Sequence, residues 1–136
     1  MTRGRAAALA FEVRDYECDL QGIVNNAVYQ QYLEHARHKF LQARGVSFAA
    51  LAKQGIHLVV VRAELDYKRP LRSGDAFMVE SHLERMTPVR YVFHQEIRRG
   101  KRRELMLSAD VICAAMNADG RPIVPRMLEP LCAAAD

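Results

Sequence analysis

The chain has only three cysteines among its 136 residues and no tryptophan. Cys18, Cys113 and Cys132 are odd in number and far apart, and the sequence contains neither a CxxC pair nor a cysteine–histidine cluster at zinc-site spacing. These absences argue against a disulfide framework and against a structural zinc site. Because disulfides are rare in reducing compartments, we expect a cytoplasmic location.

Long hydrophobic runs are also missing. The apolar run at residues 6–11 ends at Glu12, which makes it short for a signal peptide and far too short to cross a bilayer. Repeats, low-complexity stretches and linkers rich in proline, glycine or serine are absent as well. The sequence therefore predicts a single domain over residues 1–136, with no membrane partner.

Charge of one sign is not in large excess. Twenty Lys and Arg residues face 16 Asp and Glu residues, and the resulting charge of +4 is spread along the chain. Basic residues gather only at 98–103, where no aromatic side chains interleave with them for base stacking. This pattern argues against nucleic-acid binding. An acidic carrier protein is a better candidate than a nucleic acid as the partner of the basic segment 98–103.

The hydrophobic periodicity predicts one strand, one long helix and then several strands. Asn25 and Asn26 supply a helix cap, and Gly45 supplies a helix stop. We expect strands at 9–14, 57–68, 77–83, 91–98 and 105–115, helices at 25–44 and 47–55, and a short strand or tail at 122–125. The fold class is therefore α+β in two layers, a long helix wrapped by an antiparallel sheet of five or six strands.

The alternation within these segments also predicts which side chains share a face. In the strand at 57–68 the expected inner set is Val59, Val61, Ala63, Leu65 and Tyr67. In the strand at 105–115 the odd-numbered residues, from Leu105 onward, form the inner set. The other face of the sheet is expected to be partly polar and open to a partner. Since edge strands invite pairing, the sequence favours a homo-oligomer.

Asp19 is the candidate for chemistry, because it lies one loop before the start of the long helix. A helix N-terminus presents free amides that polarise a carbonyl oxygen, and a nearby carboxylate can attack that carbonyl or activate water. This combination suits acyl transfer. A solvated or capping carboxylate is the alternative that the residues alone leave open.

Two polar pairs on the helix have simpler interpretations. His35 and His38 have metal-ligand spacing, but no nearby Cys, Asp or Glu set completes a site, so no metal is expected. Glu34 and Arg37 are expected to form a surface or interface pair.

The run from Val13 to Tyr29, continued to Arg37, resembles the signature of hotdog-fold thioesterases of the 4-hydroxybenzoyl-CoA thioesterase family. Within that family it is most similar to the plant acyl-ACP thioesterases of the methylketone-synthase type, which carry a like Arg-Asp-Tyr-Glu-x-Asp run followed by Gly-x-Val-Asn-Asn-Ala. The segment 67–75 resembles the family's turn after the second strand. The resemblance implies the hotdog fold, assembled as a homodimer or homotetramer.

The resemblance also implies roles for single residues. Asp19 matches the catalytic carboxylate, Asn26 matches the residue whose backbone N–H binds the thioester oxygen, and Gly22 matches the glycine of the tight loop. Many bacterial members carry a histidine near the helix start, where this chain has Asn25 and Asn26, so the role of that histidine does not carry over. Asn25 either orients Asp19 or the attacking water, or it caps the helix. A second branch of the family places its carboxylate on the helix, where Glu34 is the alternative to Asp19.

Three further residues are expected to bind substrate at a subunit boundary. His57 precedes a valine run that could line an acyl pocket from the partner subunit, and Arg85 and Arg90 flank the turn where the family often contacts the phosphates of CoA. The implied activity is hydrolysis of acyl-CoA to a free acid and CoA, with no cofactor beyond the CoA of the substrate. The alternatives are an acyl-ACP thioesterase, an enoyl-thioester hydratase, which the missing histidine disfavours, and a non-catalytic acyl-thioester-binding protein.

Overall fold

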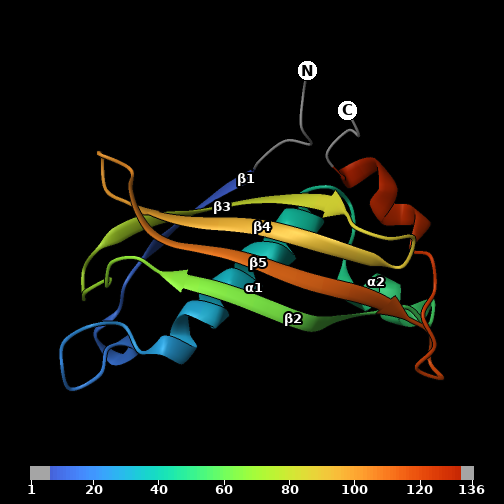
Figure 1. Ribbon diagram of the computed structural model, residues 1–136, viewed down its shortest axis with the longest axis horizontal. Coiled ribbons are helices and arrows are strands. Elements are labelled where there is room, and N and C mark those ends of the chain that lie inside the picture. The colour runs from blue at the N-terminus through green and yellow to red at the C-terminus, as the bar shows by residue number, and fades with distance from the viewer. Residues whose placement is uncertain (1–6, 133–136) are drawn as a thin grey trace.

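One antiparallel sheet curves around a long central helix in the computed structural model, which describes residues 7–132 (Figure 1). The strands are β1 (Ala7–Glu12), β2 (His57–Tyr67), β3 (Ala76–Arg85), β4 (Arg90–Arg99) and β5 (Glu104–Met116). The helices are α1 (Asn26–Gln42), α2 (Phe48–Lys53) and two 3-10 helices, η1 (Asp15–Glu17) and η2 (Arg126–Leu131). The strand order is β1-β3-β4-β5-β2, which confirms the predicted α+β fold with five strands.

Helix α1 begins where the sequence predicts and packs one face on the sheet. Its cap is the Asn25 side chain, which accepts a hydrogen bond from the Ala27 amide at 2.9 Å. The buried residues recur at three- and four-residue spacing: Tyr29, Tyr32, Leu33, Ala36, Arg37, Phe40 and Leu41. Among residues 7–132, no helix is both long and apolar enough to cross a membrane.

The inner face of the sheet follows the predicted alternation most closely in β3. Phe77, Val79, Ser81 and Leu83 are buried there, while Glu80, His82 and the other alternate residues face away from α1. The sheet therefore has an apolar inner face and a polar outer face, as the alternation predicts. η2 was not predicted, since the sequence indicated only a tail after residue 125.

The predicted facing of β2 is wrong at its first half, because the strand contains a bulge. Val60 pairs with Cys113 and Arg62 pairs with Ile112, so Val61 is an extra residue without a partner on β5. One extra residue reverses the alternation. Val60 rather than Val59 therefore shares the inner face with the later members of the set. A similar irregularity on β5 pairs Leu105 with Arg98 and removes it from the inner set.

β2 is an edge strand with an apolar, exposed centre. Val59, Val60 and Val61 expose 38%, 50% and 42% of their surface. β2 pairs only with β5, so its other edge carries backbone groups that no strand in the described residues satisfies. This is the feature that invites pairing with a second chain.

We expect two of the three thiols to be slow to react in the folded protein. Burial raises the pKa of the Cys132 thiol to about 11, and burial also raises the pKa of Cys113, so both stay protonated at pH 8. In a Cys18→Ser variant, thiol titration at pH 8 should proceed slowly in buffer and rapidly in denaturant. Fast reaction of both thiols in buffer would contradict this prediction.

Candidate active site

Asp19 opens a tight loop that leads into α1. Cys18 forms an isolated antiparallel bridge with Val24, and the Asp19 amide donates to the Ile23 carbonyl at 2.9 Å. Within the loop, the Gly22 amide donates to the Asp19 carbonyl at 3.0 Å, and Gly22 has φ +78°, a left-handed conformation that favours glycine. The loop thus holds Asp19 at the edge of the helix N-terminus, with its side chain exposed.

The first amide of α1 is free to bind a ligand. The Ala27 amide is bonded to the Asn25 side chain, and the Val28 amide donates to the Asn25 carbonyl at 2.9 Å. For the Asn26 amide, no acceptor lies among residues 7–132. The amide that the resemblance assigns to the thioester oxygen is therefore unpaired, while the Asn25 side chain caps the helix.

Glu17, which the sequence reasoning missed, ties the loop to the helix. Its carbonyl accepts from the Asn25 amide at 3.0 Å, and its carboxylate accepts from the Tyr32 hydroxyl at 2.7 Å and from the Arg14 amide at 2.8 Å. Burial, and next the hydrogen bond to Glu17, raise the pKa of Tyr32, which keeps this hydroxyl a donor. Glu17 supplies one half of a capping box by accepting from the Arg14 amide, but the arginine side chain has no acceptor for the other half, so the sequence carried no standard capping signal.

The two segments that carry the family resemblance meet at this end of the sheet. The Val24 amide donates to the Leu71 carbonyl at 2.9 Å, and the Leu71 amide donates to the Tyr29 hydroxyl at 2.9 Å. The Tyr67 hydroxyl, at the end of β2, donates to the Asn26 carbonyl at 3.4 Å. Segment 67–75 therefore packs against the start of α1, although some forty residues separate them in sequence.

His57, Arg85 and Arg90 lie at the other end of the sheet. His57 begins β2, ten residues before Tyr67, which corresponds to about 33 Å along a strand. Arg85 forms an ion pair with Glu129 at 3.1 Å, and Arg90 begins β4 beside the same turn. The structure thus brings Asp19, Gly22, Asn25 and Asn26 together, and within one chain it does not bring the other three residues to them.

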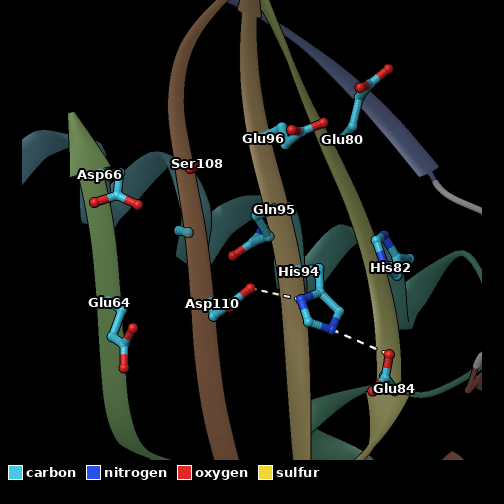
Figure 2. Close-up of a pocket in the computed structure, with 11 residues that line it drawn as sticks. Glu64, Asp66, Glu80, His82, Glu84, His94, Gln95, Glu96, Ser108 and Asp110 are labelled. Carbon is cyan, nitrogen blue, oxygen red and sulfur yellow. Dashed lines mark hydrogen bonds and ion pairs between the residues drawn. The ribbon is translucent and has the colours of Figure 1, made fainter. Parts of the chain in front are cut away.

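A cavity of about 710 Å³ lies on the outer face of the sheet (Figure 2). Its lining comprises Glu64, Asp66, Glu80, His82, Glu84, His94, Gln95, Glu96, Ser108, Ala109 and Asp110. The His94 ring lies between two acids, with Nδ1 2.6 Å from Asp110 Oδ1 and Nε2 3.4 Å from Glu84 Oε2. Carboxylates dominate this acidic groove, so its field repels anions such as the phosphates of CoA.

A smaller cavity of about 270 Å³ lies between α1 and the sheet. We call it the helix–strand slot, and its lining comprises Gln30, Gln31, Leu33, Glu34, Arg37, Val60, Ala63, Leu65 and Val111. The surface pair expected between Glu34 and Arg37 is wrong. Arg37 is only 9% exposed, and its Nη1 donates to Gln95 Oε1 at 3.1 Å instead.

The chain belongs to the Thioesterase-like superfamily, whose family model matches residues 13–131, and it has the hotdog fold of that superfamily. Its sequence is 36% identical over 112 residues to the chloroplastic acyl-acyl carrier protein thioesterase ATL3 of Arabidopsis thaliana, covering 82% of this chain and 59% of that protein. Over 75 residues it is 35% identical to the long-chain acyl-CoA thioesterase FadM of Escherichia coli, covering 55% of this chain and 56% of that protein. The chain spans about three-fifths of the length of the plant relatives it matches.

The fold is similar to that of solved thioesterases. The crystal structure of Slr0204, a 1,4-dihydroxy-2-naphthoyl-CoA thioesterase from Synechocystis, superposes with a TM-score of 0.88 at 18% identity. The superposition covers 93% of this chain and 95% of that one. At this identity the likeness supports the shared hotdog fold, and the chemistry rests on the residues described above.

Proposed function

We propose that the protein hydrolyses acyl-CoA thioesters to a free acid and CoA. The observation that carries the proposal is the unpaired Asn26 amide at the start of α1, next to the loop that presents Asp19. The names of the relatives support it, since they describe acyl-acyl carrier protein thioesterases and a long-chain acyl-CoA thioesterase. An acyl-ACP substrate is the second candidate, favoured by the plant relatives.

In the proposed reaction the thioester carbonyl oxygen accepts a hydrogen bond from the Asn26 amide. The positive end of the α1 dipole then stabilises the negative charge that develops on this oxygen. The Asp19 carboxylate either attacks the carbonyl carbon, so that the C–S bond breaks and water cleaves the mixed anhydride, or it takes a proton from the attacking water. Neither route needs a metal or prosthetic group, and CoA enters only as part of the substrate.

We further propose that the active assembly is a homodimer joined along β2, located in the cytoplasm. An antiparallel pairing of β2 with its own copy would bring the His57 end of the partner subunit to the Tyr67 end of this chain. Arg85 and Arg90 of the partner subunit lie at that same end. In this arrangement they face the thioester site and can bind the phosphates of CoA. Two such dimers would form a homotetramer.

Val61→Lys is expected to convert the dimer to a monomer and to lower thiol release at least tenfold. Val61 lies near the middle of β2, so antiparallel self-pairing places each introduced ammonium group close to its own copy. Light scattering coupled to size exclusion measures the mass. Val124→Lys is the matched control, because Val124 is similarly exposed, at 41%, but lies outside β2. A dimer that survives Val61→Lys contradicts pairing along β2.

The activity itself is tested by following thiol release from a panel of aliphatic and aromatic acyl-CoAs, with the matching acyl-ACPs in parallel. Turnover of acyl-CoA supports the proposal, and turnover restricted to acyl-ACP supports the second candidate. Tight calorimetric binding without turnover would make the protein a non-catalytic acyl-thioester binder. Hydration of crotonyl-CoA without hydrolysis would make it a hydratase.

A further inference from the structure

A polar stripe runs along α1 from the proposed thioester site. Asn26, Gln30, Glu34 and Arg37 are spaced by four, four and three residues, so they lie on one face of the helix. The last three line the helix–strand slot. Arg37 lies eleven positions after Asn26, which corresponds to about 16 Å along the helix.

The opposite wall of the slot belongs to β2 and is apolar. The hydrogen bond from the Tyr67 hydroxyl to the Asn26 carbonyl fixes the end of β2 at the start of α1. From Tyr67, the inner-face residues Leu65, Ala63 and Val60 lead back along the strand, and all three line the slot. The slot therefore runs beside α1 from Gln30, one turn after Asn26, to Arg37, with methyl groups on one side and polar side chains on the other.

Arg37 is a buried cation without a carboxylate partner among the described residues. Its one hydrogen-bond acceptor there is the neutral amide oxygen of Gln95, at 3.1 Å, whereas a guanidinium carries five N–H donors. Burial lowers the pKa of Arg37, and Cys113 and then Glu34 act in the opposite direction. Glu34 lies near enough to influence the pKa but not within ion-pair distance. A desolvated charge of this kind is stabilised strongly by a hydrogen-bonded anion.

We propose that the helix–strand slot binds an acyl chain whose far end carries a carboxylate, which Arg37 holds by paired hydrogen bonds. The inference rests on the proposed thioesterase function, and it makes monothioesters of dicarboxylic acids the preferred substrates. The methylenes of such a chain lie against Val60, Ala63 and Leu65. A saturated chain with a methyl end leaves the guanidinium desolvated and unpaired. A site with such an unpaired buried group discriminates strongly against the ligand that fails to pair it, here the methyl-ended chain.

The test compares CoA thioesters in pairs of equal chain length, namely octanoyl with 7-carboxyheptanoyl, decanoyl with 9-carboxynonanoyl and dodecanoyl with 11-carboxyundecanoyl. In the wild type, kcat/KM should favour the carboxylated member about 10- to 100-fold in at least one pair. Arg37→Met should abolish that preference, mainly by raising KM for the carboxylated ester, since the contact is made in both the ground and transition states. For the methyl-ended ester kcat/KM should rise rather than fall, because the substitution removes the guanidinium that this chain leaves desolvated and unpaired.

Two further variants keep the test independent of folding. Arg37→Lys keeps the charge but loses the forked geometry, so it should retain part of the preference. Arg62→Met removes the same charge from the outer face of β2, where Arg62 pairs with Glu64, and should leave the preference intact. Circular dichroism and a thermal melt confirm that each variant is folded.

The outcomes separate this inference from the proposed function. Turnover of methyl-ended esters with no carboxylate preference at any length overturns the role of Arg37 alone. A preference that persists in Arg37→Met overturns it too. If no thioester in the panel is hydrolysed, the proposed function fails and the inference fails with it.

Discussion

Asp19→Asn is expected to lower kcat/KM for acyl-CoA hydrolysis by about 10³-fold or more while leaving the fold intact. The substitution removes the nucleophile or general base but keeps Oδ1, which accepts the hydrogen bond from the Gln21 amide at 2.8 Å in the native loop. Asn also keeps the backbone bonds to Ile23 and Gly22. The measurement is thiol release under saturating and limiting substrate, with circular dichroism as the check on folding.

The matched control for this variant is Asp66→Asn. Asp66 is an exposed carboxylate on β2 that lines the acidic groove on the outer face, so its loss changes the net charge equally without touching the site. Full activity in a folded Asp19→Asn variant would contradict the assignment. Glu34→Gln would then be the next variant to assay, because Glu34 is the alternative carboxylate on the helix.

Gln95→Leu is expected to destabilise the protein by about 3 kcal/mol. Gln95 is 1% exposed and joins three groups: it accepts from Arg37 Nη1 and donates to the Leu33 carbonyl and to Ser81 Oγ, both at 3.0 Å. Leucine satisfies none of them, so a buried guanidinium and a buried carbonyl lose their partner. Urea denaturation followed by circular dichroism gives the change in the free energy of unfolding.

Arg37→Met provides the contrast within the same network. Methionine fills much of the volume of arginine and removes a desolvated charge, which offsets the loss of one donor to the Gln95 Oε1 atom. We therefore expect Arg37→Met to cost less than about 1 kcal/mol, far less than Gln95→Leu. If the two variants were equally destabilised, Arg37 would be a structural anchor rather than a charge retained at a cost in stability.

Most of the fold could be predicted from the sequence, because it depends on the spacing of apolar residues within single helices and strands. The apolar spacing from Tyr29 to Leu41 defines α1, and the alternation from Phe77 to Leu83 defines the inner face of β3. The bulge at Val61 escaped prediction because alternation does not show where an extra residue is inserted. η2 escaped for a related reason, since a short 3-10 helix has no periodicity to detect.

The candidate site was likewise predicted only in part. Asp19, Gly22, Asn25 and Asn26 are close in sequence, so one loop was enough to place them at the start of α1. Arg37 was misread because a charged residue on a helix is usually exposed, and its partner Gln95 lies 58 residues away on β4. The link from Glu17 to Tyr32 is likewise a contact between separate elements. Whether His57, Arg85 and Arg90 bind substrate stays a prediction, since it depends on a second chain.

The unpaired amide at the start of α1 has a consequence for which substitutions the protein can tolerate. An amide donor belongs to the main chain, so every residue type at position 26 except proline supplies it. The orientation of this donor is set by the Asn25 cap and the Gly22 turn rather than by the side chain that it accompanies. In the proposed site, Asp19 is then the one side chain required for chemistry. Residues that line the slot can therefore be substituted, and the substrate preference changed, without altering the amide that polarises the thioester.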